Sequence, residues 1–185
     1  MTRLIDGRAV AKAISEEVAG TAAALRSSGT TPTLAVVVPT DDEGTAWYVR
    51  SIERTAAKVG VACQVEKLDK PDAAQVKAKL DELSADESVH GVICQTPLPE
   101  GVTLAEVGAH IAAAKDVDGA NPESLGRLVA GVDTFAPATA AAVAEILRRE
   151  EVPLKGKHVV VVGRSIVVGK PAALLLLAEH ATVTV

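Results

Sequence analysis

The stretch from His158 to Val185, HVVVVGRSIVVGKPAALLLLAEHATVTV, decides the fold of this chain. It contains an apolar strand pattern (158–162), a turn with two glycines, an apolar helix opened by Pro171 and a short β pattern, TVTV. Proline suits the first turn of a helix because the first N–H groups there have no intrahelical acceptor. A strand, turn, helix and second strand in this order predict the first half of a Rossmann-type nucleotide-binding domain.

Four residues of that turn are candidates for holding a dinucleotide: Gly163, Arg164, Ser165 and Gly169. The glycines allow a tight turn and a close approach to a pyrophosphate, and the helix start supplies free N–H groups. The spacing G-R-S-x-x-x-G differs from G-x-G-x-x-G, so spacing alone favours dinucleotide binding and an ordinary βα turn equally. Arg164 is either a solvated surface residue or a bidentate partner for a ribose 2′-phosphate, which favours NADP over NAD.

The preceding part of the chain alternates strand-like and helix-like patterns. Helices are predicted from Asp6 to about Gly29, from about Thr45 to Val59 and from Asp72 to Leu83, with strands at TLAVVV, VACQVEKL and VHGVIC. Continuous apolar strands separated by helices predict an α/β fold with a parallel sheet covered on both faces. A segment of low periodicity, GVDTFAPAT, places a domain boundary near Phe135, which divides the chain into domains 1–135 and 136–185.

Composition excludes several classes of function. The formal net charge of −5 over 185 residues argues against a nucleic-acid partner and against an anionic membrane. The amino terminus lacks the apolar core of a signal peptide, and no apolar run reaches membrane-spanning length. Cys63 and Cys94 lie in apolar strand patterns, which favours buried reduced thiols over a disulfide or a metal site. A cytosolic protein without a metal is expected.

Two polar loops follow strand patterns, at the edge where open α/β sheets bind ligands. GVICQTPLP holds the neutral amide of Gln95 in a proline-rich turn. In KDVDGANPESLGRL, the Asp116 carboxylate is expected to be a solvated turn charge, whereas Asp118 can accept hydrogen bonds from a polar heterocycle. We predict that Gln95 and Asp118 line one cleft together with Tyr48.

Tyr48 shares a helix face with an apolar stripe in the segment WYVRSIERTAAKV. Tyr48, Ile52, Ala56 and Val59 are spaced by four, four and three residues, which is the helical repeat. Ile52 is therefore predicted to point in the same direction as Tyr48.

Five stretches together resemble the bifunctional methylenetetrahydrofolate dehydrogenase/methenyltetrahydrofolate cyclohydrolase family over nearly the whole chain. They are PTLAVVV, YVRSIERTAAKVGV, HGVICQTPLP, KDVDGANPESLGRL and LKGKHVVVVGRSIVVGKPAALLLLAEHATVTV. The resemblance implies two α/β domains, a tetrahydrofolate derivative in the cleft between them, NADP on the second domain, and a homodimer. It further implies hydride transfer from methylenetetrahydrofolate to NADP, followed by hydrolysis of the methenyl product at the same site.

The resemblance also implies roles for individual residues. Tyr48 contacts the folate, Gln95 orients a catalytic lysine and Asp118 anchors the pterin. The cofactor is held by Gly163, Arg164 and Ser165.

This chain departs from the family pattern around the cleft. Ile52 stands at the position of the family's catalytic lysine, and an aliphatic side chain has no ionisable group. Further departures are Thr40, the run 43–45, Thr96, Ala138 and Ala140. We therefore expect dehydrogenase activity, with cyclohydrolase activity lost. The alternatives are a catalytically silent paralogue that binds folate or a partner protein, and an NAD(P) dehydrogenase for another small substrate. Because family members continue beyond ATVTV, we expect the chain to be part of a longer one.

Overall fold

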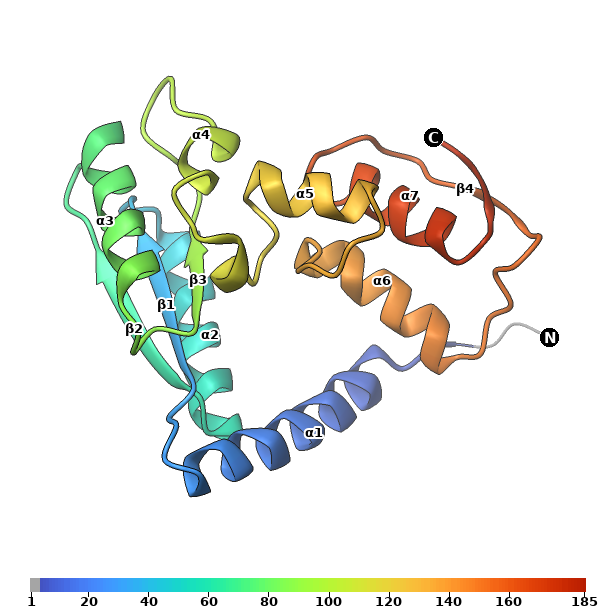
Figure 1. Cartoon of the computed structure of the whole chain (residues 1–185), viewed down its shortest axis with the longest axis horizontal. Coiled ribbons are helices and arrows are strands. Elements are labelled where there is room, and N and C mark those ends of the chain that lie inside the picture. Colours follow the sequence, from blue (N-terminus) through green and yellow to red (C-terminus); the bar gives the residue numbers. More distant parts are fainter. Residues whose placement is uncertain (1–3) are drawn as a thin grey trace.

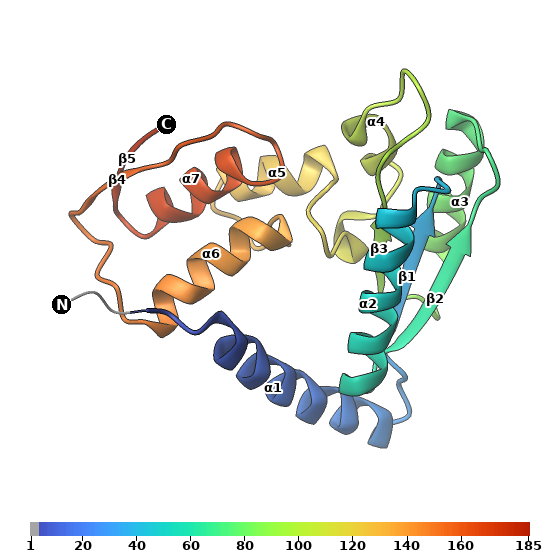
Figure 2. The ribbon, with the colours of Figure 1, turned by 180° about the vertical axis from the view of Figure 1, so that it is seen from behind.

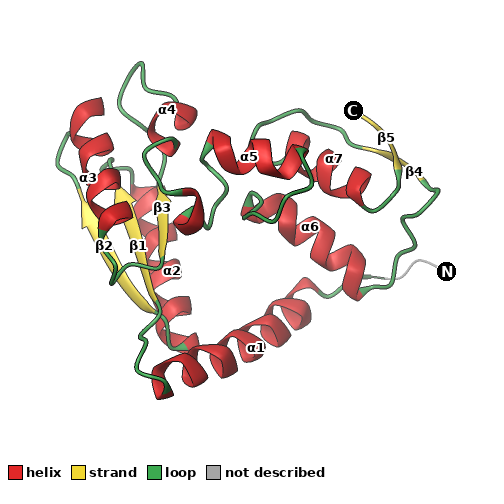
Figure 3. Cartoon of the chain, in the orientation of Figure 1, coloured by secondary structure: helices red, strands yellow, loops and turns green. Residues whose placement is uncertain are grey.

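The computed structural model describes residues 4–185, which form two parallel β-sheets connected and covered by helices (Figures 1 and 3). The first sheet has the order β2-β1-β3, and the second pairs β4 with β5. The strands are β1 (Thr33–Val38), β2 (Ala62–Lys67), β3 (Gly91–Cys94), β4 (His158–Val160) and β5 (Thr182–Thr184). The helices are α1 (Gly7–Ser27), α2 (Glu43–Val59), α3 (Ala73–Ala85), α4 (Leu104–Gly108), α5 (Pro122–Val129), α6 (Ala138–Arg149) and α7 (Gly169–Ala178), with a 3₁₀ turn at Ala113–Lys115. The predicted fold class, α/β with parallel sheets, is confirmed.

Strand β1 is the centre of the larger sheet and sends alternate side chains to opposite faces. Ala35 and Val37 belong to the core under α3, whereas Val36 and Val38 belong to the core under α2. The two helices cover opposite faces because β2 and β3 pair with opposite edges of β1 and parallel crossovers have one hand. The order of the strands therefore reverses between β1 and β3, the place where open α/β sheets generally bind ligands.

The predicted helix boundaries are largely confirmed by the caps. The Asp6 side chain accepts the N–H groups of Arg8 and Ala9 at the start of α1, and Asp72 forms a capping box with Gln75 at the start of α3. Helix α2 begins two residues earlier than expected because Asp42, rather than a later residue, caps it. It ends, as predicted, at Gly60, which adopts the left-handed conformation (φ 78°).

The second sheet is shorter and more exposed than the sequence pattern predicts. Strand β4 was expected to extend to Val162, but it ends at Val160, and the last ladder bond runs from the Val161 N–H to the Thr184 carbonyl. Val160 and Val162 are 63% and 98% exposed, because within residues 4–185 the small sheet is covered mainly by α7. Helices α4 and α5 lie in segments where the sequence predicted no helix.

Helix α1 links the two parts of the molecule and runs from α2 to α6 (Figures 1 and 2). The Arg149 guanidinium of α6 binds the Glu17 carboxylate of α1 at 2.8 and 3.0 Å and also binds Glu145 within α6. Helix α5 packs on α7, so contacts cross the predicted boundary at residue 135, and that division stays a prediction. None of the described helices is long and apolar enough to span a membrane.

Candidate active site

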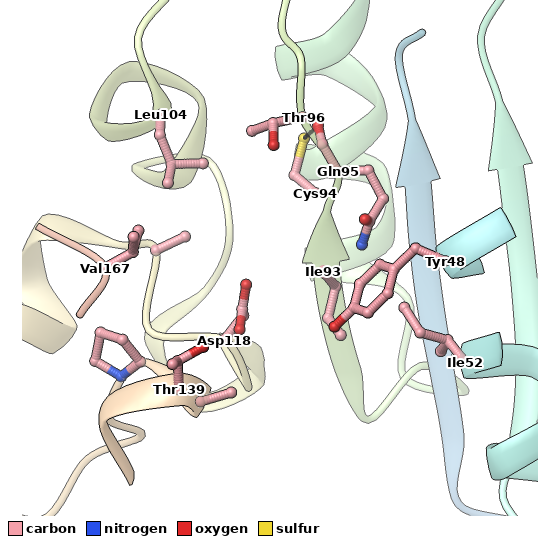
Figure 4. A pocket seen from close by; sticks show the side chains of 13 residues that line it. Tyr48, Ile52, Ile93, Cys94, Gln95, Thr96, Leu104, Asp118, Thr139 and Val167 are labelled. Atoms are coloured by element: carbon pink, nitrogen blue, oxygen red, sulfur yellow. Dashed lines mark hydrogen bonds between the residues drawn. The ribbon is translucent and has the colours of Figure 1, made fainter. Parts of the chain in front are cut away.

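A cavity of about 280 Å³ lies beside the carboxyl end of β3, the edge strand of the larger sheet (Figure 4). One wall comes from α2 and the end of β3, and the other from the loop before α5, the start of α6 and the turn before α7. Its lining comprises Tyr48, Ile52, Ile93, Cys94, Gln95, Thr96, Leu104, Asp118, Ala120, Pro137, Ala138, Thr139 and Val167. The structure thus brings Tyr48, Gln95 and Asp118 into one pocket, as the sequence predicted.

Tyr48 and Ile52 project from adjacent turns of α2 toward the cavity (Figure 4). Tyr48 is 55% exposed, so its ring is available to a ligand, whereas Ala56 and Val59, farther along the stripe, are buried. Ile52 packs at the edge of the core formed by Val36, Val38 and Val49, and it also lines the cavity. It is thus both a packing residue and an apolar part of the pocket wall.

Gln95 follows β3 directly, and its backbone N–H donates to the Val37 carbonyl at 2.9 Å. The residue is 92% buried, and its side-chain amide has no hydrogen-bond partner within residues 4–185. Thr45, near the start of α2, holds the next residue in place, because its hydroxyl donates to the Thr96 carbonyl at 2.8 Å. The Gln95 amide oxygen and nitrogen keep some accessible surface at the pocket, where they can accept from and donate to a ligand.

Asp118 lies across the cavity from Tyr48 and Gln95 (Figure 4). Although its carboxylate is accessible from the open cleft, partial burial raises its pKa above the usual 3.8, and the Asp116 charge raises it further. A backbone hydrogen bond from Ala138, at the start of α6, acts in the opposite direction. No lysine, arginine or histidine lines this cavity, so no described cation neutralises Asp118.

The expectation that Asp116 carries a solvated turn charge is wrong. Its side chain is fully buried and accepts the N–H groups of Ala120 and Asn121 at 2.8 and 2.9 Å and the hydroxyl of Ser124 at 2.6 Å. Because three donors surround the carboxylate, it can remain buried without a countercharge.

The two cysteines are free thiols, and neither belongs to a cluster of ligands. Burial raises the pKa of Cys94 to about 12, so this thiol at the cavity wall stays protonated and unreactive near neutral pH. Cys63 is partly buried, and its pKa is also raised by burial and by the Glu53 charge. Among residues 4–185, no three His, Cys, Asp or Glu side chains are grouped to hold a metal ion.

The turn between β4 and α7 has the shape of a phosphate cradle. A Cβ atom on Gly169 would lie 2.3 Å from the Gly163 carbonyl oxygen, so only glycine permits this close approach, and Gly163 itself has φ 139°. The backbone N–H groups of residues 164–167 have no protein acceptor within the described chain. Free N–H groups at a helix start, with no Cβ in the way, fit a dinucleotide pyrophosphate.

Ser165 has a structural role in this turn in addition to the predicted one, which is to offer its hydroxyl to a cofactor phosphate. Its oxygen accepts the N–H groups of Val168 and Gly169 at 3.1 and 3.2 Å and so ties the turn to the first residue of α7. Its hydroxyl hydrogen is still free to donate to a ligand. Arg164 is exposed and makes no hydrogen bond or ion pair in the described chain, which leaves its guanidinium available.

Val167 and Thr139 line the cavity, and sequence reasoning singled out neither of them. Val167 belongs to the turn that carries the predicted cofactor residues, so that turn forms part of the pocket wall. No local pattern marks either residue, because each reaches the cavity through the packing of α6 and α7 on the rest of the chain.

Two family models match the chain. The one described as tetrahydrofolate dehydrogenase/cyclohydrolase, catalytic domain, matches residues 5–118. The other, tetrahydrofolate dehydrogenase/cyclohydrolase, NAD(P)-binding domain, matches residues 137–185.

Curated relatives and solved structures agree with these models. The chain is 60% identical to the bifunctional protein FolD of Parafrankia sp. and 57% identical to the bifunctional protein FolD 1 of Saccharopolyspora erythraea. These matches cover 99% and 100% of this chain but 66% and 63% of the relatives, so the chain spans less than two thirds of their length. Among solved structures, the bifunctional FolD of Campylobacter jejuni superposes with a TM-score of 0.95 at 34% identity, covering 98% of this chain and 65% of that one. The Trypanosoma brucei FolD complexed with NADP cofactor and inhibitor superposes with a TM-score of 0.91 at 34% identity. This match covers 99% of this chain and 63% of that one.

Proposed function

Because this chain belongs to the tetrahydrofolate dehydrogenase/cyclohydrolase family, we propose that it acts as a methylenetetrahydrofolate dehydrogenase that uses NADP. The observation that carries the proposal is one cavity lined by Tyr48, Gln95 and Asp118 on its walls and by Val167 from the glycine turn. That arrangement supports a site for a polar heterocycle beside a cradle for a dinucleotide.

The chain's own residues orient the substrate in this proposal. The exposed Tyr48 ring offers a flat surface for the folate, and the Gln95 amide and the Asp118 carboxylate offer donors and acceptors for the pterin edge. Residues Gly163, Arg164, Ser165 and Gly169 hold NADP, which supplies the hydride acceptor. Orientation of the two partners in one cleft accounts for most of what the protein contributes to such a transfer.

We further propose that hydrolysis of the methenyl product is lost. Hydrolysis needs a group that moves a proton between water and a folate nitrogen, and Ile52 cannot do so. Among the other lining residues, the titratable side chains are Tyr48, Cys94 and Asp118. Cys94 is held protonated by burial, and Asp118 is assigned to the pterin.

The direct test is turnover of methylenetetrahydrofolate with NADP and with NAD, followed by absorbance of the reduced nicotinamide. We expect reduction with NADP, and accumulation of methenyltetrahydrofolate rather than formyltetrahydrofolate. Folate binding without any turnover would instead support a catalytically silent paralogue, which the departures at Thr40 and Thr96 favour. NADP binding without folate binding would favour a dehydrogenase for another small substrate.

The proposal includes a cytoplasmic homodimer. Two free cysteines, one of them buried, suit a reducing compartment. Light scattering coupled to size-exclusion chromatography measures the mass in solution, and a monomer at micromolar concentration would contradict the dimer.

Arg164→Ala is expected to weaken NADP binding by about 10- to 150-fold while changing NAD binding less than about twofold. The reason is that hydrogen bonds to a charged phosphate contribute about 1.5 to 3 kcal/mol, and NAD lacks the 2′-phosphate. The measurement is the Kd of each nucleotide by calorimetry. Lys170→Ala removes a nearby charge on α7 and is the control. Equal losses for both nucleotides in Arg164→Ala would refute the pairing with the phosphate.

Asp118→Asn is expected to weaken folate binding by about 10- to 150-fold, because an amide replaces one carboxylate oxygen with a donor.

Folate affinity in the native protein should fall with decreasing pH as Asp118 becomes protonated. Since its pKa is raised, this loss begins at a higher pH than for an ordinary aspartate. Fluorescence titration with a folate from pH 4 to 8 checks both points, with Asp133→Asn, an exposed residue outside the cavity, as the control.

A further inference from the structure

The loop that carries Asp118 is built around a second aspartate. The Asp116 carboxylate accepts three hydrogen bonds from the loop and from α5, and it has no exposed surface. The Asp116 backbone also pairs beside Val92 of β3, which anchors the residue to the edge of the sheet. The carboxylate is thus fixed relative to the strand that ends at Gln95.

The three donors determine how the loop turns. Two are the N–H groups of Ala120 and Asn121, which close the bend that contains Asp118. The third is the hydroxyl of Ser124 in the first turn of α5, where Asn121 caps the helix. Gly119 completes the bend with φ 64°, and a Cβ atom there would lie 2.6 Å from the Pro137 nitrogen. The bend is therefore held between Asp116 on its inner side and the start of α6 on its outer side.

We propose that Asp116 is a positioning residue whose buried carboxylate holds the bend of residues 116–121 so that Asp118 faces Tyr48 and Gln95 across the cavity. It contacts no ligand, because it has no exposed surface. The inference deepens the proposed function, since it rests on Asp118 being the residue that binds the folate.

The Asp116 charge has a second effect, on the protonation of Asp118. The Asp116 charge in its own loop and the Ala138 N–H of α6 act on Asp118, and the other titratable groups that line its cavity are the Tyr48 phenol of α2 and the Cys94 thiol of β3. Lys115 does not compensate, because its ammonium donates to the Asp86 carbonyl at 2.6 Å, at the end of α3. Asp116 is thus the fixed anion near Asp118, and its removal lowers the pKa of Asp118.

The experiment compares Asp116→Asn with Ser124→Ala in the full chain. Asp116→Asn removes the charge, and its new NH₂ group faces at least one of the three groups that donate to the native carboxylate. Ser124→Ala removes one hydrogen bond and keeps the charge. The first readout is the titration of the Asp118 carboxylate by carbon NMR without ligand. The second is folate affinity as a function of pH, and the third is hydrogen exchange of the Ala120 and Asn121 amides.

We expect the Asp118 titration and the acid limb of folate binding to shift to lower pH in Asp116→Asn, with faster exchange of both amides and at least tenfold weaker folate binding near neutral pH. Ser124→Ala should weaken binding less and leave the titration midpoint unchanged. An unshifted midpoint, or unchanged exchange, in Asp116→Asn would overturn the inference. If Asp116→Asn does not fold, full folate affinity and unchanged amide exchange in Ser124→Ala would overturn it. Shifted titration together with no folate binding in the native protein would refute the proposed function and leave the positioning role standing.

Discussion

Replacing Ile52 with lysine is expected to raise hydrolysis of methenyltetrahydrofolate from near background by about 10²- to 10⁴-fold, which is the typical contribution of a positioned acid or base. The native protein should reduce NADP with methylenetetrahydrofolate and release the methenyl compound. The measurement is the decay of methenyltetrahydrofolate absorbance, corrected for its spontaneous hydrolysis in the same buffer.

The geometry supports this expectation. Ile52 lies one helical turn from Tyr48 and lines the same cavity as the Gln95 amide, which has no partner in the described chain. A lysine at this position would extend its ammonium toward the Gln95 carbonyl oxygen and the Asp118 carboxylate, both acceptors. Arg50 and Arg54 of α2 line a separate surface with Trp47, and neither they nor Lys58 line this cavity.

Two variants control for effects other than the new amine. Ile52→Met keeps an apolar side chain and should leave hydrolysis at background. Thr55→Lys adds a lysine on the same helix but outside this cavity, and it should also have no effect. Rapid hydrolysis by the native protein would contradict the mechanism, because it would require another proton carrier in the cleft.

The sequence predicts the fold well where its signals are local and repeated. Apolar runs locate the strands, Asp6 and Asp72 mark helix starts, and Gly60 marks a helix end. The position of Gln95 follows from the rule that parallel sheets bind ligands at the carboxyl ends of their strands. Asp118 shares the cavity as predicted, but it follows the 3₁₀ turn Ala113–Lys115 and not a strand.

The remainder depends on tertiary contacts that no local pattern encodes. Helix α5 has an ordinary cap at Asn121, but its segment lies in a loop-like composition, and its packing on α7 is a long-range event. Asp116 is read as a solvated charge because aspartate is common in exposed turns, yet three donors supplied by residues four to eight positions later allow it to be buried. Thr139 and Val167 reach the cavity for the same reason, through packing between distant segments.

Gly169→Ala is expected to weaken NADP binding by about 10²-fold and to lower the free energy of unfolding by about 1 to 3 kcal/mol, the usual cost of overpacking. The new Cβ would lie 2.3 Å from the Gly163 carbonyl oxygen and 2.7 Å from the Arg164 nitrogen, both of them backbone atoms that cannot rotate away. The turn or the start of α7 must therefore shift. A displacement of about 1 Å at a site built on positioned groups costs about 10²-fold.

Gly20→Ala separates this local effect from the general effect of replacing a glycine. Gly20 lies within α1, and a Cβ atom there would meet nothing within 4 Å, so the substitution should stabilise the protein by about 0.5 to 1 kcal/mol through helix propensity. Urea unfolding and NADP calorimetry on both variants supply the comparison. If Gly169→Ala bound NADP as tightly as the native protein, the close approach of α7 to the Gly163 turn would not be needed for the cofactor. Binding of the cofactor would then be attributed to the Arg164 and Ser165 side chains and not to the backbone shape of the turn.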